Sequence, residues 1–237
     1  IVVDADGMAP TASDWLRQRP RLIYTTPSHQ YPVGSVMSLA RRLALIDGAR
    51  QAGALVIEDD YDSEFRHDGP PLACMQGLAP DAPVVYLGTF SKTMFPGLRI
   101  GFMVVPTALA PALALLLDRA APRGRTADQR ALAEFIVSGQ FALHLRRMRR
   151  LYRQRRDALV AALALHLGDV ATVHGGTAGM HLALRLHDAA ADDVALSRRL
   201  IAQHGIMAPA LSLHAVGLRA QPWRGFLLGY AQVPVES

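Results

Sequence analysis

The chain has 237 residues, of which 51% are hydrophobic, and it carries a formal net charge of +5 with a sequence pI of about 9.9. This length and apolar content are enough to bury a large core, in one domain or in a large and a small one. Cys74 is the only cysteine, which excludes an internal disulfide and a cysteine-based metal cluster, and the nine histidines have no ligand-like spacing, so we expect no metal site.

Strands and helices alternate through the first half of the chain. Apolar runs bounded by turn residues mark the strands, and capping residues such as Thr11 or Ser13, Ser38 and Gly53 mark the helix ends. The predicted elements are a strand over residues 1–4, a helix over 11–19, a strand over 21–26, a helix over 39–51, and strands over 54–59, 84–87 and 100–105. This alternation predicts an α/β fold with a mostly parallel, helix-covered sheet.

Long helical patterns replace the alternation from residue 107 onward. The predicted elements here are helices over 107–120, 126–138 and 140–167, strands over 170–173 and 180–186, a helix over 192–204, and apolar runs near Ile206 and over 226–230. Gly175, Gly176 and Gly179 lead into a strand, so they predict a turn and not a phosphate loop. We predict three parts: residues 1–125 as part of a large cofactor-binding domain, 126–167 as a helical connection, and 168–237 as a small α+β domain.

The longest apolar stretch, residues 108–117, is too short to span a bilayer and contains Pro111. No charged and then apolar leader precedes the first residue. We therefore expect a cytoplasmic protein without a membrane partner.

Much of the positive charge lies in residues 146–156, which read RRMRRLYRQRR. Apolar residues recur on one face of the same predicted helix, at Phe141, Leu145, Met148, Tyr152, Leu159 and Leu163. We expect the arginine-rich face to be a solvated or inter-subunit surface, in preference to a nucleic-acid surface.

The stretch VVYLGTFSKTMFPGLRIGF, residues 84–102, places reactive side chains at the end of a buried strand. Thr89, Ser91 and Lys92 follow that strand, at the position where open α/β sheets keep their ligands. Arg99 opens the next strand, so a guanidinium returns beside the amine and the hydroxyls. Two hydroxyls and a guanidinium predict a phosphate cradle.

The alternative for an isolated S-K-T is an ordinary surface cation at a strand end. A second stretch favours chemistry, because the strand predicted over residues 54–59 puts Glu58, Asp59 and Asp60 at its end. An amine, a phosphate cradle and a carboxylate at neighbouring strand ends suit pyridoxal phosphate. The aldehyde of that cofactor condenses with a lysine, and its ring nitrogen must stay protonated.

Three motifs together carry a family resemblance. They are TPSHQYPVG at residues 26–34, EDDYDSEF at 58–65 and GTFSKTMFPGLR at 88–99. With them the chain resembles the fold-type I aminotransferases, which depend on pyridoxal phosphate. It is most similar to the aminotransferase-like domain of MocR-type regulators in the GntR superfamily, and the resemblance runs over the whole chain.

The resemblance implies a role for each site residue. Lys92 is the catalytic residue and forms the aldimine with pyridoxal phosphate. Asp59 pairs with the pyridinium nitrogen, with Asp60 as the alternative, and Tyr61 hydrogen-bonds the 3′ oxygen unless it is only a half-buried strand aromatic. The implied cofactor-binding residues are Asp59, Tyr61, Thr89, Ser91, Lys92 and Arg99.

Two segments depart from the family pattern. Tyr31 stands where many aminotransferases have the asparagine of an Asn-Pro-Thr-Gly turn, so that contact to the 3′ oxygen is lost or passes to Tyr61. Residues 226–231 (FLLGYA) lack the arginine that grips a substrate carboxylate, and only Arg219 and Arg224 lie close in sequence. The chain also begins inside a strand and ends without the family's closing helix, so we expect a fragment whose N-terminal part is missing.

The sequence therefore predicts the pyridoxal-phosphate-binding, effector-sensing domain of a MocR-type transcription regulator, with an amino acid or another small amino compound as effector. The resemblance implies a homodimer, and DNA binding only through a winged-helix domain absent from this chain. The alternative is a free-standing aminotransferase that transfers an amino group between an amino acid and a 2-oxo acid. A third possibility is a degenerate domain that has kept the fold without the cofactor.

Overall fold

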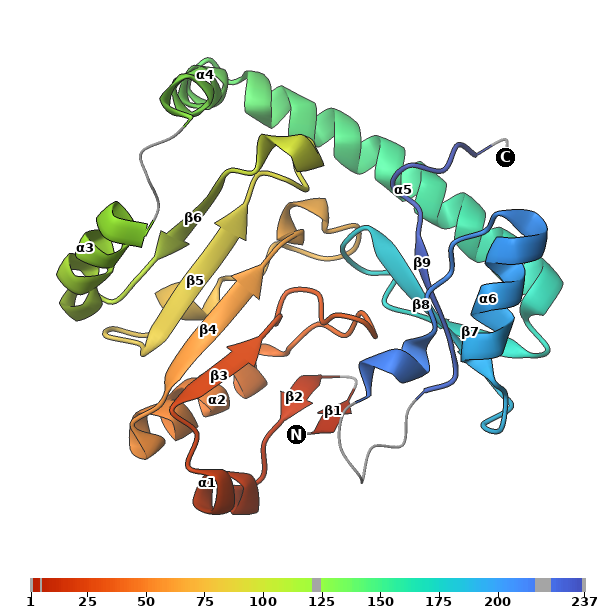
Figure 1. Cartoon of the computed structure of the whole chain (residues 1–237), viewed down its shortest axis with the longest axis horizontal. Coiled ribbons are helices and arrows are strands. Elements are labelled where there is room, and N and C mark those ends of the chain that lie inside the picture. Colours follow the sequence, from red (N-terminus) through yellow and green to blue (C-terminus); the bar gives the residue numbers. More distant parts are fainter. Residues whose placement is uncertain (1, 5, 121–124, 216–222, 236–237) are drawn as a thin grey trace.

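The computed structural model describes residues 2–4, 6–120, 125–215 and 223–235. Two sheets are the main feature, and the long helix α5 (Gln140–Leu167) runs past both of them (Figure 1). The fold is α/β, as the sequence predicts. Among the described helices, none has the length and apolar character needed to cross a membrane.

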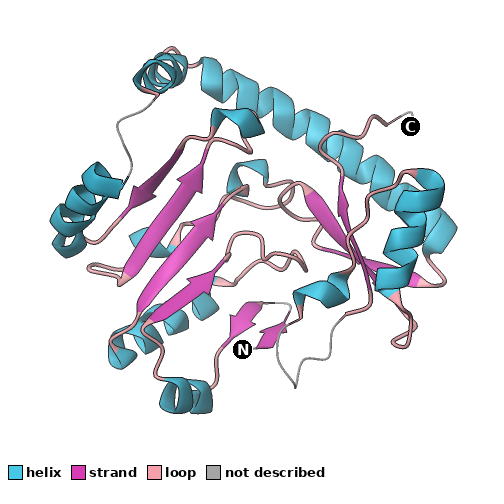
Figure 2. Cartoon of the chain, in the orientation of Figure 1, coloured by secondary structure: helices cyan, strands magenta, loops and turns pink. Residues whose placement is uncertain are grey.

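The larger sheet has four strands, in the order β3 (Leu22–Thr25), β4 (Leu55–Asp60), β5 (Val84–Thr89) and β6 (Gly101–Val104). The first three are parallel, whereas β6 is antiparallel to β5 because residues 90–100 join the two without a crossover helix. The sheet is thus mostly parallel. The carboxyl ends of β3, β4 and β5 share one edge with the start of β6 (Figure 2).

Helix α2 (Leu39–Ala52) covers one face of this sheet. Ser38 caps its first turn and Gly53 ends it in the left-handed conformation, as the sequence predicts. On the opposite face, Leu22 and Tyr24 are exposed. The core between α2 and the sheet includes Ile23, Leu45, Ile46, Ala49, Val56 and Val84.

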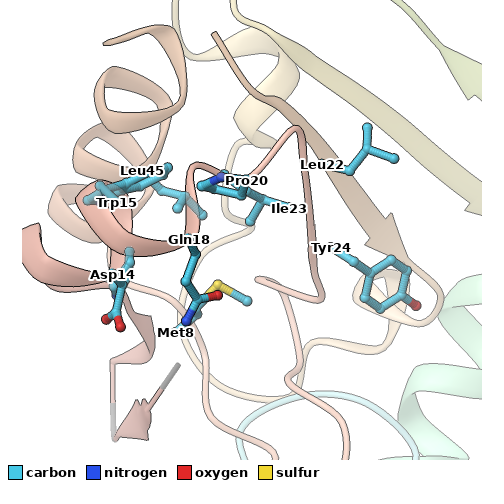
Figure 3. A pocket seen from close by; sticks show the side chains of 10 residues that line it. Met8, Asp14, Trp15, Gln18, Pro20, Leu22, Ile23, Tyr24 and Leu45 are labelled. Atoms are coloured by element: carbon cyan, nitrogen blue, oxygen red, sulfur yellow. The ribbon is translucent and has the colours of Figure 1, made fainter. Parts of the chain in front are cut away.

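A short hairpin and a short helix precede the larger sheet. Strands β1 (Val2–Asp4) and β2 (Gly7–Ala9) are antiparallel, and helix α1 (Ala12–Gln18) begins at a capping box of Thr11 and Asp14. Figure 3 shows Trp15 of α1 beside Leu45 of α2 at a pocket of about 160 Å³. This pocket is smaller than the roughly 300 Å³ at which small-molecule sites begin.

The second half of the chain contributes helices and a smaller antiparallel sheet. Helices α3 (Ala110–Ala120) and α4 (Thr126–Val137) precede α5, and strands β7 (Ala171–His174), β8 (His181–Leu186) and β9 (Gly225–Gly229) pair in that order. Helix α6 (Asp193–His204), capped by Asp192, packs on this sheet. Short 3₁₀ turns occupy Ser63–Phe65, Met75–Gly77, Pro96–Leu98, Thr107–Leu109 and Leu211–His214.

Two predictions about this half have clear outcomes. The glycines at 175 and 179 lie in a turn with positive φ, as predicted. The apolar run near Ile206 forms no strand, and Ile206 is exposed. The division of the chain at residues 125 and 167 stays a prediction, and residues 121–124 beside the first boundary lie outside the described ranges.

The arginine-rich face of α5 is largely exposed, as predicted, but part of it contacts the chain itself. Four of its arginines bind the chain itself, because the loop after β4, the turn between β7 and β8 and the segment after β9 turn backbone carbonyls toward the helix. The pairs are Arg149 with the Glu64 carbonyl, Arg153 with the His67 carbonyl, Arg155 with the Ala231 carbonyl, and Arg156 with the Gly176 carbonyl and the Asp68 carboxylate. Arg149 and Arg153 are nevertheless exposed, as predicted, whereas Arg155 and Arg156 are partly buried against their partners. On the apolar face, Leu145 is buried and Tyr152 packs edge-on against Phe65, as predicted.

Candidate functional site

The sheet topology brings the predicted site residues to one edge. Asp59 and Asp60 end β4, and Thr89 ends the neighbouring parallel strand β5. Ser91 and Lys92 follow directly in the turn that leaves β5. These are the carboxyl ends of parallel strands, where ligands bind in open α/β sheets.

A large open cavity of about 1480 Å³ lies at this edge and extends toward the smaller sheet. Asp59, Tyr61, Ser91 and Lys92 line it. Within the described part of the chain, Thr89 and Arg99 are not among the lining residues. The structure thus brings four of the six predicted cofactor-binding residues to one cavity, and the other two do not line it.

Lys92 lies on a closed loop. The Phe90 N–H donates to the Ile100 carbonyl at 2.9 Å and closes the loop at its base, and the Met94 N–H donates to the Phe90 carbonyl at 2.9 Å. His144 of α5 hydrogen-bonds the Thr93 carbonyl at 2.8 Å, so the loop is also attached to the long helix. The Lys92 side chain is exposed, and Lys92 is the only lysine in the 237 residues.

Thr89 and Arg99 shape this loop. The Thr89 hydroxyl accepts the Ser91 N–H at 3.1 Å, which fixes the turn before Lys92. Arg99 ends the Pro96–Leu98 turn with φ 50°, a left-handed conformation that non-glycine residues seldom adopt. Its side chain is exposed.

The two candidate carboxylates have different surroundings. Asp59 lines the cavity and accepts the hydroxyl hydrogen of Tyr24 from β3. Burial, and then this contact, raise the pKa of Tyr24 to about 12, so Tyr24 stays a donor. Asp60 points to the other side of β4, where it is buried and accepts hydrogen bonds from Ser63 at 2.7 Å and Tyr86 at 2.9 Å. The geometry therefore favours Asp59 over Asp60 as the group that meets a ligand.

Tyr61 is both a cavity residue and a hydrogen-bond donor. Its hydroxyl donates to the His29 carbonyl at 2.8 Å and lies 3.5 Å from His29 Nδ1. Burial raises the pKa of Tyr61 well above its usual range, with the nearby Asp62 and Asp59 adding to the shift. The phenol is therefore protonated at any ordinary pH.

Sequence reasoning missed a polar cluster behind Tyr61. His29, Asp62 and His181 are buried, and one polar atom from each lies within 4.8 Å of the others. The signal was present in the motifs SHQ and YDS, but His181 comes from β8, far along the chain. Burial lowers the pKa of His181 to about 3, with the neighbouring His29 and Lys92 contributing, so its ring is neutral.

The wall of the cavity next to the smaller sheet is mainly apolar. Leu227 and Leu228 of β9 line it, and Arg155 of α5 lines it as a cation. Arg224 lies 3.5 Å from the Asp193 carboxylate at the start of α6, so it is engaged beside the smaller sheet. Arg219, the other arginine considered for carboxylate recognition, lies outside the described residues.

The model of the family Aminotransferase class I and II matches residues 3–223 of this chain. The chain is 42% identical over its whole length to the probable rhizopine catabolism regulatory protein MocR of Rhizobium meliloti, and covers 47% of it. It is 35% identical, over 97% of its length, to the HTH-type pyridoxine biosynthesis transcriptional regulator PdxR of Corynebacterium glutamicum, and covers 48% of it. The chain thus spans about half the length of these relatives.

Solved structures share the fold over nearly the whole chain. The multiple substrate aminotransferase of Thermococcus profundus superposes with a TM-score of 0.85 at 25% identity, covering 99% of this chain and 59% of that one. LysN, an α-aminoadipate aminotransferase of Thermus thermophilus, has a TM-score of 0.82 at 27% identity and covers 99% and 60%. The LysN structure contains N-(5′-phosphopyridoxyl)-L-leucine.

Proposed function

The chain belongs to the class I and II aminotransferase family, and from this premise we propose that it is the pyridoxal-phosphate-binding, effector-sensing domain of a MocR-type transcription regulator. Similarity to regulators at 35–42% identity, over 97–100% of the chain, supports the regulator class. The observation that carries the cofactor assignment is that Lys92, Asp59 and Tyr61 line one cavity.

The donor set of this cavity fits pyridoxal phosphate. It offers a primary amine for the aldehyde, a carboxylate for the ring nitrogen and a phenol oxygen that can accept the hydrogen of the 3′ hydroxyl, since the Tyr61 hydrogen goes to the His29 carbonyl. Ser91 offers a hydroxyl to the phosphate, and Thr89 and Arg99 lie on the same closed loop beside it. When bound, this cofactor supplies an aldehyde that links to amines and a ring that withdraws electrons from the linked carbon.

Each residue then has a defined task. Lys92 Nζ would hold the cofactor through its aldehyde, and when released by an amino ligand it would be free to hold or move a proton at the carbon next to the ligand nitrogen. The Asp59 carboxylate would keep the ring nitrogen protonated, because a nearby opposite charge favours the charged ring. The Tyr61 hydroxyl orients the ring through its 3′ oxygen.

The effector in this proposal is an amino acid or another small amino compound, and its exchange with Lys92 shifts the protein between two conformations. The whole protein is proposed to be a cytoplasmic homodimer. DNA contact belongs to a winged-helix domain outside the described chain. The α5 arginines that bind backbone carbonyls are occupied within this chain, which agrees with a DNA surface elsewhere.

A second function is a free-standing aminotransferase. The likeness to the T. profundus enzyme over 99% of this chain favours it. In the regulator proposal, the gene codes for a basic winged-helix segment upstream of this chain, whereas the enzyme proposal has none.

One experiment separates the two functions. The whole gene product is purified with pyridoxal phosphate, amino compounds are added singly with a 2-oxo acid, and the visible spectrum and the new amino acid are followed. The regulator proposal predicts a spectral change with one ligand class and at most one turnover. Repeated turnover with several amino donors would contradict it and establish the enzyme.

A further inference from the structure

The buried cluster of His29, Asp62 and His181 joins the cofactor edge of the larger sheet to the smaller sheet. His29 lies in the loop after β3, Asp62 in the loop after β4, and His181 begins β8. Their exposed fractions are 1%, 1% and 8%. Asp62 and His181 also line the cavity that contains Lys92.

His29 is held from two sides. Its Nδ1 lies 3.0 Å from the Asp62 carboxylate, so a ring proton on Nδ1 donates to that carboxylate. The ring of His181 covers the His29 ring, with centroids 4.3 Å apart and planes 35° apart. In turn, the His29 carbonyl accepts the Tyr61 hydroxyl at 2.8 Å. The position of the Tyr61 hydroxyl therefore depends on how His29 is fixed.

A glycine from the smaller domain completes this packing. Gly179 has φ +79°, and a Cβ added to it would lie 1.9 Å from His29 Nδ1 and 2.6 Å from Asp62 Oδ2. Its N–H donates to the Phe65 carbonyl at 2.9 Å, which fastens the turn to the loop after β4. Gly179 thus packs directly on the His29–Asp62 pair, and its backbone fills the space beside His29 Nδ1 and Asp62 Oδ2. This packing argues against a metal ion at the same three side chains.

We propose that His29 and His181 are positioning residues of the cofactor site: Asp62 fixes the His29 ring, His29 holds the Tyr61 hydroxyl, and His181 of the smaller domain covers His29. This inference rests on the proposed pyridoxal phosphate site. It makes the Tyr61 contact to the 3′ oxygen depend on the docking of the smaller domain, so that a domain movement alters the grip on the cofactor ring.

The test compares the binding of pyridoxal phosphate with that of its analogue lacking the 3′ hydroxyl. One hydrogen bond is worth about tenfold in affinity, so the wild type should prefer the natural cofactor by about that factor. Tyr61→Phe should lose the preference. Asp62→Asn and His181→Ala should reduce it to within about twofold of the Tyr61→Phe value, and adding Tyr61→Phe to either should cause no further loss.

Two variants separate positioning from folding. His181→Phe keeps a ring over His29 but removes both ring nitrogens, of which Nε2 has no hydrogen-bond partner among the described residues, and the other side of the ring loses its contact with the Pro32 backbone. Because the proposal assigns His181 only the covering of His29, this variant should retain the preference. Asp47→Asn makes the same chemical change as Asp62→Asn on the exposed face of α2 and should match the wild type. A full preference retained by Asp62→Asn and His181→Ala would overturn the proposal.

Measurements without the cofactor distinguish this failure from failure of the proposed function. The His29 ring proton should give a downfield NMR signal in the cofactor-free protein, and Asp62→Asn should abolish it. Absence of that signal from the wild type overturns the positioning proposal whether or not pyridoxal phosphate binds. If the NMR signal is present but the protein does not bind pyridoxal phosphate, the cofactor assignment is wrong, and so is the proposed role of His29 in holding Tyr61 for the cofactor. Stoichiometric zinc that is lost in Asp62→Asn would also overturn the proposal, because the cluster would then be a metal site.

Discussion

Replacing Arg42 with methionine should destabilise the protein strongly and loosen the loop that carries His29. The Arg42 guanidinium is 1% exposed and donates to the carbonyls of Pro27 at 2.9 Å, Met37 at 3.0 Å and Ala73 at 3.1 Å. It also lies 3.5 Å from the fully buried Glu58 carboxylate. Arg42 therefore ties both ends of the 27–37 loop to the core.

The expected magnitude follows from the burial of both charges. Burial raises the pKa of Glu58, whereas two backbone N–H groups and Arg42 act in the opposite direction. Removing one partner of a buried ion pair leaves the other uncompensated and costs about 3–5 kcal/mol. Arg42→Met should lose that much, and adding Glu58→Gln should recover part of it.

Urea unfolding at pH 7, followed by the fluorescence of Trp15 against the α2 core, measures this loss. The matched control is Arg41→Met, one residue earlier on the same helix. Arg41 forms a partly exposed pair with Asp4 at 3.2 Å, which should contribute about 1 kcal/mol or less. If the two variants lose the same stability, the reasoning about Arg42 is wrong.

Three further predictions concern charge, chemistry and packing. Burial raises the pKa of Glu64 from 4.5 to about 7, so the free energy of unfolding falls as the pH rises through this window, by at most about 3 kcal/mol. Glu64→Gln should therefore unfold at a higher urea concentration than the wild type at pH 8, but not at pH 4.5. Asp59→Ala should still attach pyridoxal phosphate to Lys92 but lose most deuterium exchange at the ligand carbon, and undiminished exchange would refute the ring-nitrogen assignment. Phe65→Ala should cost about 3–5 kcal/mol in urea unfolding because Phe65 is fully buried, whereas Leu165→Ala at a 79% exposed position should cost almost nothing.

Local signals in the sequence were sufficient for most of the elements. Ser38 and Gly53 mark the two ends of α2, as their capping chemistry predicts. The 28 residues of α5, from Gln140 to Leu167, show a long and regular helical period. Strand β2 has only three residues, too few to show a period. The apolar run at Ile206 has the composition of a strand, but only the residues after it pair with β9, through the Ala210–Phe226 bridge.

The site residues could be predicted only where a reactive or charged side chain directly follows a predicted strand. Lys92 and Asp59 follow apolar runs directly, so the order of the strands was enough to place them together. The His29, Asp62 and His181 cluster depends on the docking of two sheets, which no local pattern records. The contacts of the α5 arginines could not be predicted for the same reason, since three of their four carbonyl partners lie 76–86 residues away along the chain and are invisible as charge.

The most direct test of the cofactor assignment is to trap pyridoxal phosphate on the protein with borohydride and map the modified peptide. Lys92 is the only lysine in the 237 residues. A label on any other amine within these residues would therefore have to be on an N-terminal amine. We expect a visible absorption band that borohydride removes and a label on the peptide containing Lys92, both absent from Lys92→Ala. No band, or an undiminished label in Lys92→Ala, would contradict the account.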